Sequence, residues 1–112
     1  MEFEQSEQQL TITELITFEK SFSRNIPIDF KEHYLKYNGG YPPYENLKGL
    51  QNIFTINGFY PIKYGRLPIE KIIKDYKNSG IDFIDMIPFA YDSCGNIYLL
   101  SIETNTYGYV YI

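Results

Sequence analysis

The chain has 112 residues and a formal net charge of −4, with 44% hydrophobic and 21% charged residues. This length and balance predict a single globular domain over residues 1–112 and exclude an intrinsically disordered chain. Cys94 is the single cysteine, which excludes an intramolecular disulfide and a cysteine-based zinc site.

The first half of the chain carries the signals of two helices. Thr11 and Glu14 form a capping-box pattern, and apolar residues at helical spacing follow, which predicts a helix over about residues 12–22. Pro27 suits the first turn of a second helix, because its missing N–H is not needed there. Asn38-Gly39 predicts that this second helix ends in a left-handed, Schellman-type cap.

The middle of the chain predicts turns around short strands, and then a helix. Residues 53–56 have the composition of a strand, and Asn57-Gly58 is a typical tight-turn pair leading into Phe59-Tyr60. Leu67-Pro68 opens a third, amphipathic helix, which Gly80 ends.

The last third predicts antiparallel strands separated by turns. Residues 86–91 form a strand with Pro88 near its start or on an edge, and residues 92–96 form a turn. Residues 97–102 are apolar on both faces, as in a central strand, and residues 107–112 close the chain with three tyrosines on one face. The order of elements indicates an α+β fold with an antiparallel β-sheet packed against helices.

The sequence offers poor material for catalysis. His33 is the only histidine and lies four residues after Asp29 in the predicted second helix, while Cys94 lies in a turn with no base nearby in sequence. A small hydrolase using His33 or Cys94 would need both residues in one pocket. We therefore expect no catalytic residue, no metal site and no cofactor.

Charge is distributed unevenly along the chain. Residues 1–19 hold five acids and no base, residues 78–112 hold four acids and no base, and all ten Lys and Arg residues lie between. This balance argues against direct nucleic-acid binding and favours a basic protein partner. The acidic start is unlike a signal peptide, and no apolar run reaches the roughly 20 residues of a membrane span, so we expect a cytoplasmic protein.

Tyrosine is the most distinctive residue type, with twelve tyrosines, eight phenylalanines and no tryptophan. Tyrosine is enriched at binding surfaces because it combines apolar area with a polar end. Tyr41 and Tyr44 bracket a Pro-Pro pair that would present them as a stiff ridge. We expect surface recognition there and on the tyrosine face of the last strand.

Four segments taken together resemble the Smi/Knr-type members of the SUKH superfamily. These are FEKSF, IPIDFKEHYLKYNGGYPP, IPFAYDSCGNIYLLSI and YGYVYI, in the family's order over about residues 12–112, after an acidic lead-in at residues 1–11. The residues that match the family motifs are Pro27, Tyr37, Asn38, Gly39, Gly40, Asp92, Gly95, Asn96 and Gly108. The resemblance implies a curved antiparallel sheet packed by helices, with structural roles for these motif residues.

The resemblance also implies a non-enzymatic role. Bacterial members are immunity proteins that neutralise a cognate toxin domain, often a nuclease, of contact-dependent or polymorphic toxin systems, and fungal relatives act as regulatory scaffolds. The alternative here is a regulatory or adaptor module of the same fold. Candidate partner-binding residues are Tyr41, Tyr44, Glu45, Asp92, Glu103 and Tyr107. We expect a monomer, or a weak homodimer through an exposed last strand.

Overall fold

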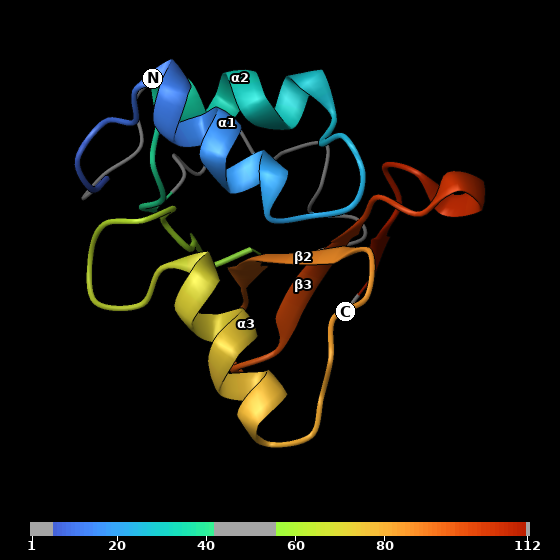
Figure 1. The fold of residues 1–112 in the computed structure, drawn as a ribbon. Helices are drawn as coiled ribbons and strands as arrows, with labels where there is room; N and C mark the ends of the chain where they lie inside the picture. Colours follow the sequence, from blue (N-terminus) through green and yellow to red (C-terminus); the bar gives the residue numbers. More distant parts are fainter. Residues whose placement is uncertain (1–5, 42–55, 112) are drawn as a thin grey trace.

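The computed structural model describes residues 6–41 and 56–111, and these residues form an α+β fold (Figure 1). Helices α1 (Ile12–Lys20) and α2 (Ile28–Lys36) come first, and α3 (Ile69–Asn78) lies between the first two strands in sequence. The strands form one antiparallel sheet in chain order, namely β1 (Gly58–Phe59), β2 (Met86–Tyr91), β3 (Ile97–Ser101) and β4 (Val110–Tyr111). The predicted α+β class is confirmed.

The helices bury apolar side chains against the sheet from two directions. In Figure 1, α1 and α2 run next to each other above the sheet, and α3 lies below them and packs on β2. Each element contributes to one core, including Leu15 from α1, Tyr34 from α2, Ile69 from α3 and Ile87 from β2. Burying each such side chain contributes about 1.5–3 kcal/mol, so this core is the main source of stability.

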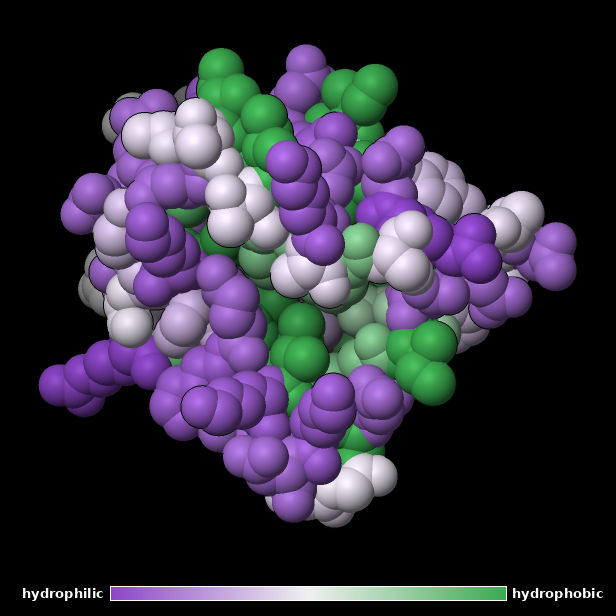
Figure 2. Space-filling model, viewed as in Figure 1, coloured by the Kyte–Doolittle hydropathy of each residue, from purple (hydrophilic) through white to green (hydrophobic). Residues whose placement is uncertain are grey.

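Helix α1 begins as predicted and ends two residues earlier. The Thr11 hydroxyl accepts from the Glu14 N–H, and the Glu14 carboxylate accepts from the Thr11 N–H, so the capping box is present. The Ser21 hydroxyl donates to the Phe18 carbonyl at 2.6 Å and caps the helix end. Helices α1 and α2 keep exposed apolar side chains, namely Ile12, Ile16 and Ile28. Figure 2 shows hydrophobic surface in this part of the molecule.

The end of α2 corrects the predicted Schellman cap. Tyr37, directly after the helix, is extended with φ of −136°, and the left-handed residues are Gly39 (φ 80°) and Gly40 (φ 98°), further along. The cause of this extended backbone is a contact outside the helix. The buried Asn38 side chain hydrogen-bonds the main chain of Ile62. The chain extends at Tyr37 so that Asn38 can reach that partner.

The predicted tight turn at Asn57-Gly58 is wrong. Gly58 begins β1 and pairs with Tyr91, and the Asn57 N–H donates to the Tyr91 carbonyl at 2.8 Å. The Tyr91 ring lies over Gly58, so a side chain at this position would displace that ring, and the glycine does not mark a turn. Residues 53–55 of the predicted strand lie outside the described residues.

Strands β2 and β3 match the sequence closely. β2 has the predicted bounds, and its register with β3 shifts between Pro88 and Ala90, so the proline sits at an irregularity inside the sheet. Within β2, the residues that pair with β1 are Ala90 and Tyr91, so Pro88 lies beyond the end of β1 and removes no hydrogen bond to it. β3 lies between β2 and β4, as predicted for a central strand.

The last strand is shorter than predicted. β4 comprises Val110–Tyr111, and the preceding residues form the 3₁₀ helix η2 (Thr104–Thr106) and a turn at Tyr107 and Gly108. Tyr107 therefore does not belong to a tyrosine face of the strand. Among the described residues β4 pairs with β3 alone. No helix within the described ranges has the length and apolar character required to cross a membrane.

Candidate functional site

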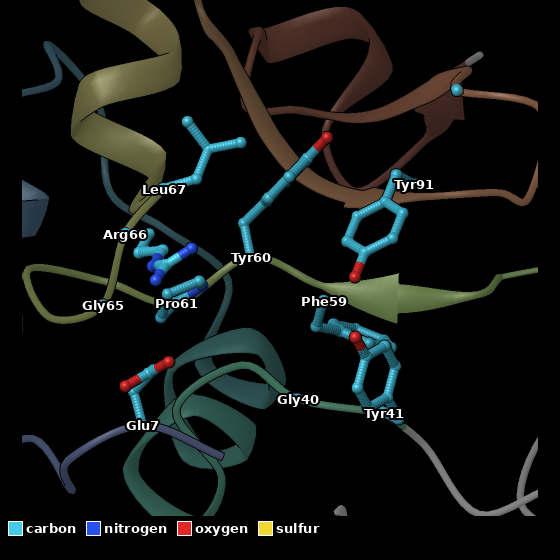
Figure 3. A pocket seen from close by; sticks show the side chains of 11 residues that line it. Glu7, Gly40, Tyr41, Phe59, Tyr60, Pro61, Gly65, Arg66, Leu67 and Tyr91 are labelled. Atoms are coloured by element: carbon cyan, nitrogen blue, oxygen red, sulfur yellow. The ribbon is translucent and has the colours of Figure 1, made fainter. Parts of the chain in front are cut away.

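A cavity of about 670 Å³ opens where β1, the segment before α3 and the turn after β2 meet (Figure 3). We call it the tyrosine pocket, because three tyrosines form much of its wall. The lining residues are Glu7, Gly40, Tyr41, Phe59, Tyr60, Pro61, Gly65, Arg66, Leu67, Tyr91 and Gly95. They come from segments far apart in the sequence, from Glu7 to Gly95, so the pocket exists only in the folded protein.

Tyr60 and Tyr91 form the inner part of the pocket. The Tyr60 N–H donates to the Phe89 carbonyl at 2.9 Å and the Tyr60 carbonyl accepts from the Tyr34 hydroxyl at 2.7 Å, so both ends of its main chain are fixed. The two rings lie 4.9 Å apart between centroids and are tilted by 40°. Burial raises the pKa of Tyr60 to about 12, so its phenol is a neutral donor at physiological pH.

Tyr41 stands at the rim of the same pocket and is 40% exposed. The preceding residue, Gly40, exchanges two main-chain hydrogen bonds with Phe59, at 3.1 and 2.9 Å, which extends the sheet by one bridge. The Tyr41 side chain hydrogen-bonds Tyr91, and burial together with this bond raises the pKa of Tyr91. The bridge therefore holds Tyr41 where it can meet both Tyr91 and a ligand.

Glu7 and Arg66 bring opposite charges to the pocket, on the side away from Tyr41 and Tyr91 in Figure 3. The Glu7 N–H donates to the Asn38 carbonyl at 3.0 Å, and its carboxylate lies against Gly65, where an added Cβ would be 2.9 Å from the Glu7 Cδ. Neither side chain forms a hydrogen bond or ion pair with the described residues. Both side chains contribute to the pocket wall.

A second surface lies at the corner between β3 and β4. Arg24 pairs with Asp85 at 3.1 Å and donates to the Thr104 hydroxyl at 2.7 Å, and the Tyr107 hydroxyl donates to the Asn25 carbonyl at 2.9 Å. The bond to Arg24 is the main cause of the lowered pKa of Asp85. These bonds fasten the corner to the loop between α1 and α2.

The predicted partner-binding residues fall on both surfaces. Tyr41 lines the tyrosine pocket, whereas Glu103 and Tyr107 lie at the β3–β4 corner. Tyr44 and Glu45 lie outside the described residues. The structure thus does not gather the predicted set into one site.

Asp92 stabilises the turn in which it lies. Its carboxylate accepts from the N–H groups of Cys94 and Asn96 at 2.9 and 2.8 Å, and from the Asn96 side chain at 2.9 Å. The bond from the Asn96 side chain is the main cause of the lowered pKa of Asp92. Gly95, with φ of 89°, completes the turn and reaches the pocket wall. Asp92, Gly95 and Asn96 together hold one side of the pocket in shape.

Sequence reasoning missed most of the pocket, including Glu7, Tyr60, Arg66, Leu67 and Tyr91. Tyr60 and Tyr91 each end a short apolar run, so the sequence marks both as strand residues without indicating that they meet. Their approach follows from the pairing of β1 with β2, where Phe59 lies opposite Ala90. The only signal available was the high tyrosine content of the chain.

The residues considered for a hydrolase do not meet. His33 lines a smaller cavity of about 280 Å³ with Asp29 and Phe59, where burial lowers its pKa, while Cys94 is exposed in the turn after β2 and does not line that cavity. The condition that both residues share one pocket therefore fails. Among residues 6–41 and 56–111, no three His, Cys, Asp or Glu side chains gather as a metal ion requires.

Comparison with known proteins gives one match. The model of the SMI1 / KNR4 family (SUKH-1) matches residues 9–112, which include every helix and strand described above. This range begins three residues before the region in which we recognised the resemblance. No curated protein and no solved structure matches the chain significantly.

Proposed function

Because the chain belongs to the SMI1/KNR4 family (SUKH-1), we propose that it is an immunity protein that binds and blocks one cognate bacterial toxin domain, such as a nuclease, without chemistry of its own. Membership of the family is consistent with this role. We further propose that it acts in the bacterial cytoplasm as a monomer or weak homodimer.

The observation that carries the proposal is the tyrosine pocket. An open concavity lined by tyrosine rings, a leucine and an arginine has the composition found at the energetic centres of protein–protein interfaces. Its wall is held by main-chain hydrogen bonds at Gly40 and Tyr60, so little ordering is needed on binding. Such preorganisation favours tight association.

The net charge supports a basic partner. At −4, the chain attracts a positively charged domain over a distance of about a Debye length, roughly 8–10 Å at physiological salt. Enzymes that bind nucleic acids carry basic surfaces, so a nuclease toxin fits this charge. We expect the attraction to speed association and to weaken as salt is added.

The test is calorimetric titration of this protein with the toxin domain encoded beside it, at two salt concentrations. Sub-micromolar binding that weakens with salt, together with loss of the toxin's activity in the complex, is the expected result. Tight binding that ignores salt would contradict the electrostatic part alone. Failure of the neighbouring domain to bind would overturn the immunity role and favour the adaptor alternative.

A further inference from the structure

We propose that the tyrosine pocket receives a positively charged side chain, best an arginine, projecting from the bound partner. The proposal names what one part of the interface recognises, and in that sense it rests on the proposed function. It is carried by three properties: the aromatic wall of the pocket, the Glu7 carboxylate that lines it, and the net negative charge of the whole protein.

The aromatic wall suits a flat cation. Tyr41, Tyr60 and Tyr91 gather at one end of the pocket, and the Tyr60 and Tyr91 rings are tilted to each other by 40° with centroids 4.9 Å apart. The face of an aromatic ring attracts a cation within about 6 Å of its centroid. A guanidinium group can stack on a ring while its N–H groups donate to phenol oxygens, which an ammonium group does less well.

Glu7 supplies a carboxylate at the other end of the pocket. Its position is set by its neighbours, because its N–H donates to Asn38, the adjacent Ser6 hydroxyl donates to Gly39 at 3.0 Å, and its side chain lies against Gly65. The carboxylate has no partner among the described residues. A guanidinium can donate two parallel hydrogen bonds to such a carboxylate.

Arg66 is the feature that opposes a cation, and it makes the proposal testable. Glu7 and Arg66 are both exposed; the main chain of Glu7 is held by its hydrogen bond to Asn38, and the long Arg66 side chain can turn toward solvent. The protein as a whole carries a net charge of −4, which favours the approach of a cationic partner. If the ligand is cationic, removing Arg66 strengthens binding; if it is anionic, the same change weakens it.

Two apolar residues of the pocket fit the rest of an arginine side chain. Leu67 and Pro61 both line the pocket, and in Figure 3 Pro61 lies beside Arg66. The three methylene groups of an arginine would cover this apolar surface while its head reaches the tyrosines or Glu7. The volume of about 670 Å³ leaves room for the main chain of the inserted loop as well.

The experiment needs no toxin, so its failure and the failure of the proposed function are distinguishable. The ¹⁵N-labelled protein is titrated with N-acetyl-arginine amide, N-acetyl-leucine amide and N-acetyl-aspartate amide, and amide shifts are followed by NMR. We expect saturable shifts around residues 58–67 and 91–95 from the arginine compound, with a Kd on the order of 1–10 mM. The leucine and aspartate compounds should bind at least several-fold more weakly.

Three variants separate the charge of the pocket from charge in general. We expect Glu7→Gln to weaken the binding of the arginine compound several-fold, and Arg66→Ser to strengthen its binding. The matched control is Glu32→Gln, which removes the same charge from an exposed position on α2. It should change the Kd of the arginine compound by less than twofold. An unfolding curve for each variant confirms that it is folded.

Several outcomes overturn the proposal. Preferential binding of the aspartate compound, together with loss on Arg66→Ser, would show an anionic ligand. Equal effects of Glu7→Gln and Glu32→Gln would show general electrostatics, and an absence of localised shifts at near-saturating concentration would show that the pocket takes no cationic side chain.

Discussion

The side-chain amide of Asn38 pairs with the main chain of Ile62 as a neighbouring strand would. Its Nδ2 donates to the Ile62 carbonyl at 2.9 Å, and its Oδ1 accepts from the Ile62 N–H at 2.7 Å. The same Nδ2 also donates to the Gln8 carbonyl at 2.9 Å, and Asn38 is 1% exposed. One side chain therefore joins the N-terminal segment, the end of α2 and the segment before α3.

Asn38→Ala should strongly destabilise the protein. Three main-chain groups lose their partner where water has little access, and we expect a loss of about 3 kcal/mol in the free energy of unfolding. Urea unfolding followed by circular dichroism measures it. Asn105→Ala, at an exposed position in η2, is the control and should cost less than about 0.5 kcal/mol. Equal costs for the two variants would contradict the role given to Asn38.

Gly39→Ala and Gly80→Ala separate backbone strain from collision. Both glycines have positive φ, 80° and 92°, so both variants place alanine in a left-handed conformation at a cost of about 1 kcal/mol. An added Cβ at Gly39 would lie 2.9 Å from the Pro61 nitrogen, whereas at Gly80 it would meet nothing within 4 Å. We expect Gly39→Ala to cost at least about 2 kcal/mol more in urea unfolding. A similar loss in both would show that the contact with Pro61 is easily relieved.

Glu14 should make stability depend on pH in the acid range. The Lys63 ammonium at 2.7 Å, with further hydrogen bonds from Thr11 and Tyr64, lowers the pKa of Glu14 from 4.5 to about 2. Because the folded-state pKa is the lower one, the ionised carboxylate stabilises the fold above pH 4.5. This contribution is lost as the pH falls from 4.5 through 2.

The measurement for Glu14 is the urea midpoint of the protein and of Glu14→Gln between pH 2 and 7. We expect the variant to be less stable at pH 7, with the difference shrinking as the pH falls through that window. Glu32→Gln is the control and should follow the unsubstituted protein throughout. A constant difference between Glu14→Gln and the unsubstituted protein at all pH values would argue against the ion pair as the source.

Gly58→Ala should alter the tyrosine pocket with little effect on the fold. A Cβ at this position would collide with the Tyr91 hydroxyl, so the Tyr91 ring must move. The end of a tyrosine side chain can shift, and we expect the cost in unfolding free energy to be below about 1 kcal/mol. NMR shifts of the Tyr60 and Tyr91 rings should change together, because the rings are in contact. Unchanged ring shifts would contradict the packing described here.

Tyr41→Ala and Tyr107→Ala decide which surface binds the partner. The two tyrosines are similarly exposed, at 40% and 45%, and lie on the tyrosine pocket and the β3–β4 corner respectively. We expect Tyr41→Ala to reduce the affinity for the toxin domain by at least about tenfold, and Tyr107→Ala to change it by less than about threefold. Calorimetry measures both. The reverse result would transfer the interface to the corner.

Local chemistry made much of the fold predictable. The capping box at Thr11, the proline at the start of α3 and the turn at Asp92–Asn96 all act within a few residues of themselves, so the sequence indicates them directly. The bounds of β2 were also correct. Such elements depend little on what the rest of the chain does.

The errors share a physical cause, which is a partner far away in sequence. Asn38 leaves the helical path for Ile62, 24 residues later, and Gly58 is a glycine because of Tyr91. Both are turn-type residues used for a tertiary contact. The tyrosine pocket was missed for the same reason, because its walls come from segments that no sequence spacing connects.

In the pocket wall, main-chain groups form the hydrogen bonds that hold the shape, and side chains form the surface that a ligand would meet. At Gly40, Phe59 and Tyr60 the fold uses N–H and C=O groups, which every residue type except proline supplies in full. Other side chains can replace Tyr41, Arg66 and Leu67 while these main-chain hydrogen bonds keep the wall in shape. The surface that this fold presents to a partner can therefore change through a few substitutions, while the hydrogen bonds that hold the fold stay the same.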